Sequence, residues 1–258
     1  MGTAVETVDR TAFVDWLQRV GDNTLILGHR VSEWCGHSPA LEEDIALANQ
    51  ALDLIGQCQF WLGYAGEVEG QGRTADQIAY LRDAGAFRNA LLVERPNGDF
   101  GQTLMRQFLF DAYHIELLRA LKASSDPRVA EIAAKAEKEV AYHLERSADL
   151  VIRLGDGTAE SHARMQKALD GLFGYTGELF MDDAVDQAVA DAGIAPLPST
   201  LKPAWDRTVS AVLVEATLIH PGQVYMHKGG KKGVHSEYLG FILAEMQFLQ
   251  RAYPGAVW

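Results

Sequence analysis

The sequence contains few cysteines and no long apolar run. Its 2 cysteines in 258 residues, Cys35 and Cys58, lie too far apart for a CxxC metal or redox motif, and nothing indicates a secreted disulfide framework. We therefore expect both to be reduced thiols in the core. No apolar stretch approaches the roughly 18 residues that a membrane span requires, and the start, MGTAVETVDR, is polar and acidic. These absences predict a cytoplasmic protein without a membrane partner.

Positive charge is also scarce. The chain has 23 Lys and Arg against 35 Asp and Glu, a net charge of −12, which argues against nucleic acid or an anionic membrane as the main partner. Its 48% hydrophobic and 22% charged residues allow a large core. Period-2 alternation, internal repeats and long linkers are missing, so we expect residues 1–258 to form a single all-α domain.

Apolar residues recur instead at helical spacing along almost the whole chain. Start signals are clear at Thr74, whose capping box includes Gln77, and at Asp126, which precedes Pro127. In the second helix we expect an inward face that contains Leu41, Ile45, Ala48, Leu52, Ile55 and Leu62. The pattern predicts helices over residues 11–35 (with an irregularity at 21–23), 41–66, 75–82, 100–123, 127–154, 159–182, 184–192, 202–217 and 235–253.

The helix Phe100–Ala123 carries two polar residues on its apolar face. Asp111 and His114 are one helical turn apart among inward apolar positions, so both side chains are expected to point into a core. This is the spacing at which ferritin-like four-helix bundles supply two ligands to a buried di-iron site, usually as Glu-x-x-His. The other helices decide whether such a site is complete.

A di-iron site also needs one inward carboxylate from each of two helices and a second acid-x-x-His pair. Asp44 or Asp53 fits the first carboxylate, and Glu139 fits the other. The second pair is missing from the helix after residue 159. There His162 has an alanine three residues before it, and Glu178 has a methionine three residues after it.

We therefore expect no metal site and no catalytic residue in this chain. The four polar residues Asp111, His114, Glu139 and His143 are then expected to satisfy one another across the bundle, because an unpaired buried charge costs several kcal/mol. The alternative is a metal-binding oxygenase that is active in its own right. A third hypothesis is a general scaffold.

Other motifs are weak. The stretch Gly229–Gly233 resembles a phosphate-binding loop only in composition, and a flexible basic connection is the favoured interpretation. No G-x-S-x-G elbow of a serine hydrolase occurs. Four aromatic residues are expected in the core rather than in a cofactor pocket: Trp16, Trp34, Phe108 and Phe110.

Four longer stretches are far more specific: SEWCGHSPALEEDIALANQALDLIGQ, FRNALLVERPNGDFGQTLMRQFLFDAYH, KEVAYHLERSADLVIRLGDGT and GGKKGVHSEYLGFILAEMQFLQR. Through them nearly the whole chain resembles the ferritin-like subunits of the bacterial ring-1,2-phenylacetyl-CoA epoxidases, multicomponent monooxygenases of phenylacetate degradation. The resemblance is to the structural subunit. It implies a ferritin-like four-helix bundle with flanking helices, paired with a homologous catalytic subunit that holds the di-iron site.

The resemblance also implies the remaining partners and a substrate contact. The partners are a small accessory subunit and a reductase that uses FAD, an iron–sulfur cluster and NADPH. The substrate is phenylacetyl-CoA, and two segments are implied to lie near its CoA part. Arg88 makes chemical sense as a phosphate contact and Phe87 as a neighbour of adenine, although an exposed loop with one core aromatic is an equal alternative. The implied residues are Ala86, Phe87, Arg88, Asn89, Gln187, Ala188 and Val189.

Overall fold

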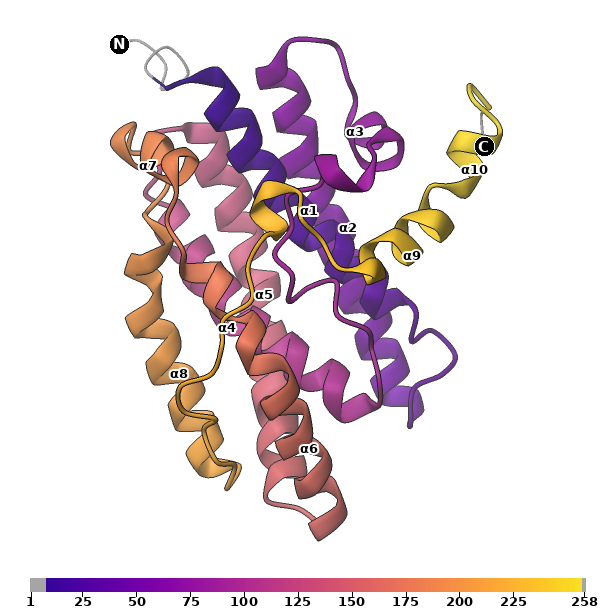
Figure 1. Ribbon diagram of the computed structural model, residues 1–258, viewed down its shortest axis with the longest axis vertical. Coiled ribbons are helices and arrows are strands. Elements are labelled where there is room, and N and C mark those ends of the chain that lie inside the picture. The colour runs from indigo at the N-terminus through magenta and orange to yellow at the C-terminus, as the bar shows by residue number, and fades with distance from the viewer. Residues whose placement is uncertain (1–7, 257–258) are drawn as a thin grey trace. The chain divides into compact units, whose positions relative to one another are not determined.

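A computed structural model describes residues 8–256, and within that range it contains helices and no strand (Figure 1). The all-α prediction is confirmed, and the helical architecture is consistent with a ferritin-like fold. The described residues divide into two compact units. The central unit is Pro96–Lys228. The terminal unit combines Val8–Arg95 with the C-terminal segment that begins at Gly229.

The terminal unit is built on two long antiparallel helices, α1 and α2. Two glycines of α1 face α2: Gly21 lies against Leu62, and Gly28 lies against Ile55. A β-carbon at Gly21 would lie only 2.6 Å from the Leu62 side chain. The predicted irregularity at residues 21–23 is wrong, because α1 is continuous there and the glycine serves close helix packing. The elements of this unit are α1 (Arg10–Ser32), α2 (Leu41–Glu69), α3 (Ala75–Leu81), η2 (Ala84–Ala86), η6 (Gly230–Lys232), α9 (Glu237–Met246) and α10 (Phe248–Ala252).

The central unit is organised around α4, which packs against α5, α6 and α8. Nearly all of α4 is buried, as expected for the helix that carries Asp111 and His114. Lys122, directly after α4, forms a salt bridge of 2.5 Å with Glu137 of α5, and Asp111 further back in α4 bonds to Ser147 further along α5, so the two helices run antiparallel. The elements are α4 (Phe100–Leu121), α5 (Pro127–Gly155), α6 (Ala159–Leu172), η3 (Phe173–Tyr175), η4 (Gly177–Phe180), α7 (Ala184–Asp191), η5 (Pro198–Leu201) and α8 (Lys202–Glu215).

Local capping signals predicted the starts of two helices correctly. Thr74 accepts a hydrogen bond from the Gln77 backbone and the capping box is complete, while Asp126 caps α5 with Pro127 in its first turn. Two long predicted helices are shorter than expected. The helix after residue 159 ends at Leu172 and continues as 3-10 turns. The last helix breaks at Gln247, whose side chain donates hydrogen bonds to backbone carbonyls of α3 and of the residue after it.

One face of α2 differs from the prediction. Leu41, Ile45 and Leu52, expected inside, are 71%, 53% and 70% exposed. The buried side instead carries Leu54 and Trp61, because that side faces α1. Both sides of α2 carry apolar residues, so periodicity alone predicted the wrong side to be buried. The terminal unit therefore presents an apolar stripe that its own helices do not cover.

The cysteine prediction is half wrong. Cys58 is buried in α2, but Cys35 is exposed. The reason is that α1 ends at Ser32, which places Cys35 and the half-buried Trp34 in the turn before α2. Among residues 8–256, no helix combines the length and the apolar composition needed to cross a membrane.

Candidate functional site

A buried polar cluster lies between α4 and α5 in the central unit. Gln107, Asp111 and His114 are four and then three residues apart on one side of α4, and His143 and Ser147 are four apart on α5. All five side chains are buried. The Asp111 carboxylate accepts hydrogen bonds from Gln107 Nε2 at 2.7 Å and from Ser147 Oγ at 2.9 Å. The Ser147 bond ties α5 to α4.

Burial sets the protonation of this cluster. Desolvation raises the pKa of Asp111 to about 6, although the His143 charge and the two hydrogen bonds favour the carboxylate. Desolvation lowers the pKa of His114 to about 3, and repulsion from His143 acts in the same direction. Near neutral pH the cluster therefore contains an ionised Asp111 and a neutral His114.

His114 does not pair with Asp111, so that part of the predicted network is wrong. Neither ring nitrogen of His114 has a hydrogen-bond partner within residues 8–256. The imidazole lies beside Phe110, with 5.1 Å between ring centroids. Asp111 is directed at α5 instead, where Ser147 satisfies it. Glu139, the other expected member, is only half-buried.

The donor set does not fit a di-iron centre. Within the described part of the chain, no group of three or more His, Cys, Asp or Glu side chains is arranged to hold a metal ion. His162 lies at the start of α6, where its Nδ1 is 2.7 Å from the Gly155 carbonyl oxygen. Asp44 accepts a hydrogen bond of 2.8 Å from the Gly36 backbone in the turn before α2, and Asp53 is half-buried. No step of an oxygenase reaction can be derived from these residues.

A second buried network lies in the terminal unit and centres on Glu94. His235 Nδ1 lies 2.9 Å from the Glu94 carboxylate, and the Ser236 backbone donates to the same carboxylate at 2.7 Å. His235 Nε2 lies 3.0 Å from the Phe87 carbonyl oxygen. Burial by itself would lower the pKa of His235, but the bonds to Glu94 and Phe87 outweigh it and the pKa is raised. Both ring nitrogens face acceptors, which favours the imidazolium.

A buried ion pair holds the same region from the other side. Arg82 forms a salt bridge with Asp22 of α1. Asp22 also accepts a hydrogen bond of 2.8 Å from the Arg88 backbone. Together with Glu94 and His235, this pair fixes the backbone of residues 86–89 between α1 and the C-terminal segment.

The four residues of the first implied substrate segment have different environments. Phe87 is fully buried, and the Arg82 guanidinium lies 4.3 Å from its ring centroid. Asn89 is also buried and donates to Glu94 at 3.1 Å. Ala86 and Arg88 are half-buried, and Arg88 Nε lies 3.0 Å from the Asp15 carboxylate. Arg88 is therefore the charged side chain of this segment that solvent reaches.

The second implied segment is part of α7 in the central unit. Gln187 is exposed and donates a hydrogen bond of 2.7 Å to Asp191 one turn later. Ala188 is half-buried, and Val189 is fully buried. Gln187 is thus the residue of this segment whose polar group faces solvent. A CoA contact at either segment stays a prediction.

Comparison with known proteins identifies the family. Residues 2–258 match the family described as phenylacetic acid catabolic protein. The chain belongs to this family. One relative is a subunit of the 1,2-phenylacetyl-CoA epoxidase of Escherichia coli (strain K12). The two sequences are 50% identical over 240 residues, which cover 93% of this chain and 96% of the relative.

Sequence patterns did not predict the Glu94 and Asp22 networks of this family member. Glu94 follows the apolar run Leu91–Val93, and an acid directly after such a run is a signal that could have drawn attention to it. No comparable signal marks His235, because its partner is 141 residues away in the sequence. Asp22 lies in the stretch for which the pattern predicts a helix irregularity.

Proposed function

We propose that this chain is the non-catalytic subunit of a phenylacetyl-CoA 1,2-epoxidase of aerobic phenylacetate degradation, where it stabilises a homologous di-iron catalytic subunit. The family match over residues 2–258 and the identity to the Escherichia coli epoxidase subunit support its place in such an enzyme. The donor set between α4 and α5 supports the non-catalytic role.

The composition of that cluster is the observation that carries the proposal. Gln107 and Ser147 satisfy the Asp111 carboxylate with neutral donors, so the carboxylate needs no cation to offset its burial. His114 is held neutral by desolvation. The residues in the place of a metal centre thus act as a link between two helices, which is a structural role.

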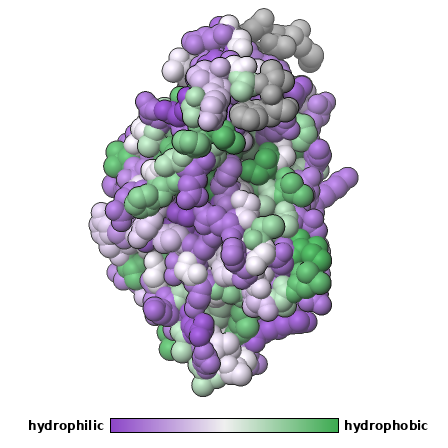
Figure 2. All heavy atoms as spheres, turned by 90° about the vertical axis from the view of Figure 1, so that its right-hand side faces the viewer, coloured by the Kyte–Doolittle hydropathy of each residue, from purple (hydrophilic) through white to green (hydrophobic). Residues whose placement is uncertain are grey.

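An interface with the catalytic subunit is supported by apolar side chains that the chain leaves exposed. The α2 stripe contains Leu41, Ile45 and Leu52, and α9 with α10 adds Phe241 and Phe248, which are 62% and 61% exposed. Figure 2 shows hydrophobic atoms at the surface on the side that carries α9 and α10. Obligate interfaces bury roughly 2,000 Å² or more and have apolar centres of this kind.

The remaining partners follow from the same proposal. A reductase with FAD and an iron–sulfur cluster would take electrons from NADPH and pass them to the di-iron subunit, and a small accessory subunit would complete the hetero-oligomer. This chain would hold no cofactor of its own. CoA esters and NADPH are both cytoplasmic, so the complex would work in the cytoplasm.

The proposal is tested by comparing the catalytic subunit alone and mixed with this chain. We expect size-exclusion chromatography to show a stable complex. Thermal melting of the catalytic subunit should rise by roughly 5–10 °C when this chain is present well above the dissociation constant. An unrelated helical protein at the same concentration is the control. A catalytic subunit that melts at the same temperature and turns over at the same rate in both samples contradicts the structural role.

A further inference from the structure

We propose that His235 is a proton-dependent latch that holds the C-terminal segment on the terminal unit, and that this segment opens on its own when His235 loses its proton. The segment, residues 229–256, forms a strap that contains η6, α9 and α10. Within the terminal unit, α9 packs against α1 and α10 packs against α3. The whole central unit separates the strap from Val8–Arg95 in the sequence, so noncovalent contacts alone hold the strap in place.

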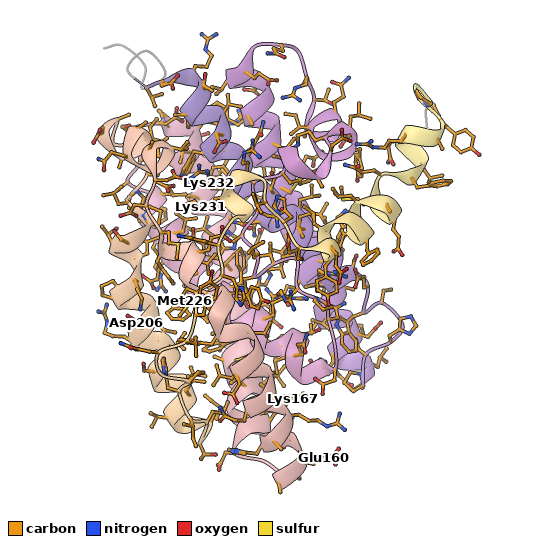
Figure 3. The ribbon with its side chains drawn as sticks, in the orientation of Figure 1. Glu160, Lys167, Asp206, Met226, Lys231 and Lys232 are labelled. Atoms are coloured by element: carbon orange, nitrogen blue, oxygen red, sulfur yellow. The ribbon has the colours of Figure 1, made fainter. Side chains whose placement is uncertain are left out.

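The strap begins with an ordered turn, η6, and not with the flexible connection expected from its composition. The Gly233 backbone donates to the Gly230 carbonyl at 2.9 Å. Figure 3 labels the two lysines of this turn, Lys231 and Lys232. A β-carbon at Gly230 would be 2.1 Å from the Asn89 carbonyl oxygen, so the turn lies directly against the segment 85–91. This contact brings the residues that follow the turn to Glu94.

The His235 side chain, 4% exposed, lies between two groups that accept hydrogen bonds. Its Nε2 is 3.0 Å from the Phe87 carbonyl oxygen, which can only accept, so Nε2 carries a hydrogen. Its Nδ1 is 2.9 Å from the Glu94 carboxylate. That carboxylate also accepts from the Ser236 backbone at 2.7 Å and from the Asn89 side chain at 3.1 Å. A ring that donates from both nitrogens is an imidazolium, so the closed strap binds a proton.

Glu94 depends on this charge. Its side chain is 0% exposed, and His235 is the only cation among residues 8–256 with which its carboxylate forms a salt bridge. Loss of the His235 proton therefore leaves a buried carboxylate without a counter-charge, which is unfavourable in a site that excludes water. Opening of the strap lets water solvate both groups. Deprotonation thus favours the open strap.

Other charges near the latch do not replace His235. Each of the three arginines in this region forms a salt bridge with an acid other than Glu94. Asp22 favours the protonated form of His235. The charged groups that α1, the segment 82–95 and the strap bring to the region, besides Glu94, are Asp22, Arg30, Arg82, Arg88, Lys231, Lys232 and Glu237.

The polar contacts at the far end of the strap come from groups that keep their protons near neutral pH. Gln247 donates to the Ala79 carbonyl at 3.0 Å and to the Arg82 carbonyl at 2.9 Å. Arg251 donates to the same Arg82 carbonyl at 2.9 Å. His235 is the only histidine in residues 229–258, and histidine is the side chain that ordinarily titrates between about pH 5 and 8. The proton dependence of the strap is therefore expected to come from His235.

This dependence has a defined sign. Burial by itself would lower the pKa of His235, but the hydrogen bonds to Glu94 and to the Phe87 carbonyl outweigh it, and the pKa is raised above 6.5. The closed strap thus binds the proton more tightly than the open strap does. The latch is complete below pH 6.5 and is lost as pH rises through the raised pKa. In that range the opening equilibrium increases by up to about ten-fold per pH unit.

The latch also affects assembly. Phe241 and Phe248, which the proposed function assigns to the interface with the catalytic subunit, belong to α9 and α10 of the strap. Opening of the strap displaces both side chains. This consequence rests on the proposed function, whereas the latch itself is a property of the isolated chain.

The test follows the strap in the isolated full-length chain. Hydrogen exchange with mass spectrometry at pH 6.0, 6.5, 7.5 and 8.5 gives protection factors for α9, α1 and α4, corrected for the intrinsic pH dependence of exchange. The variant is His235→Gln, whose side chain cannot carry the charge. His37→Gln, at an exposed histidine of the same unit, is the matched control. NMR titration of the His235 ring in the wild type is a second measurement that needs no variant.

We expect the protection of α9 in the wild type and in His37→Gln to fall by up to about ten-fold per pH unit above pH 6.5, while that of α1 and α4 stays constant. In His235→Gln the protection of α9 should be lower at pH 6.5 and should not change with pH. Protection of α9 that is constant in the wild type, or that falls equally in His235→Gln, overturns the latch.

Two further outcomes overturn the proposal. Loss of protection in α1 together with α9 means that the strap does not open on its own. A His235 ring that titrates at or below pH 6.5 in the wild type means that the closed strap does not bind the proton, and this result stands even if His235→Gln fails to fold. None of these outcomes depends on a catalytic subunit, so the proposed function is tested separately.

Discussion

Asp111 is the residue at which the polar cluster is tested most simply. Its carboxylate is buried and receives the Ser147 and Gln107 hydrogen bonds. Asp111→Ala removes the acceptor of Gln107 Nε2 and leaves Ser147 Oγ with only its 3.3 Å bond to the Leu144 carbonyl. We expect a loss of about 1–3 kcal/mol in the free energy of unfolding, measured by urea titration. Asp149→Ala, at an exposed acid on α5, should change it by less than about 0.5 kcal/mol.

The same variant separates structure from catalysis. If Asp111 is structural, any loss of epoxidation in the complex should follow the loss of folded subunit. A variant that remains stable and assembled but abolishes turnover would mean that Asp111 takes part in the reaction.

His114 gives a pH dependence with a defined sign. Its pKa is about 3 in the folded chain and 6.5 in the reference state, so the unfolded chain binds more protons between these values. Stability from the neutral imidazole is complete above pH 6.5 and is lost as pH falls toward 3, by at most about 1.4 kcal/mol per pH unit. Asp111, with a pKa raised to about 6, acts in the opposite direction between pH 3.8 and 6.

The contribution of His114 is isolated by comparing wild type with His114→Leu. Urea unfolding of both proteins at pH 7.0, 6.0 and 5.0 gives the difference in their free energies of unfolding. That difference should shift in favour of the leucine variant as pH falls, because only in the wild type does the unfolded chain gain a proton at residue 114 that the buried imidazole does not take up. A difference that is constant across the three values means that His114 is not held neutral by burial.

At the scale of elements, the contact of α1 with α2 depends on a glycine. A β-carbon at Gly21 would lie 2.6 Å from the Leu62 side chain, whereas at Gly63 no atom lies within 4 Å. Gly21→Ala should therefore destabilise the chain by about 1–3 kcal/mol through overpacking. Gly63→Ala should stabilise it by up to about 1 kcal/mol, the usual gain in a helix. Thermal melting that ranks the two variants in the other order contradicts the close packing of α1 on α2.

The exposed stripe of α2 is a second test at this scale. Leu41→Gln with Leu52→Gln should weaken binding to the catalytic subunit at least ten-fold, since truncating buried anchors in an interface costs about 2 kcal/mol or more. The stability of the isolated chain should hardly change, because both side chains are exposed in it. Glu42→Gln, at an exposed neighbour, is the matched control. Titration calorimetry with unchanged affinity would place the interface elsewhere.

The same elements indicate what the sequence could predict. Helix starts at Thr74 and Asp126 followed from caps, which are local interactions between residues close in the chain. The buried side of α2 did not follow, because both sides are apolar and only the partner helix decides between them. That His114 has no hydrogen-bond partner within residues 8–256 did not follow either, since this depends on where the neighbouring helix places its polar groups.

At the scale of the whole molecule, most of the contacts that the sequence did not predict join residues far apart in the chain. The burial of Asp111 and His114 was predictable from periodicity on a single helix. The Glu94–His235 link was not, because it joins residues far apart in the sequence. The proposal of an assembly with a catalytic subunit is supported by the family match and by apolar side chains that this chain leaves exposed.

The central claim is that this chain contributes structure and no reaction centre to an epoxidase. The most direct measurement is iron content and epoxidation by each subunit purified alone and by the reconstituted complex, with the reductase and phenylacetyl-CoA supplied. We expect iron in the catalytic subunit and in the complex, a trace in this chain, and no epoxidation by this chain alone. Near-stoichiometric iron bound to the isolated chain, or epoxidation by it without the catalytic subunit, would contradict the claim.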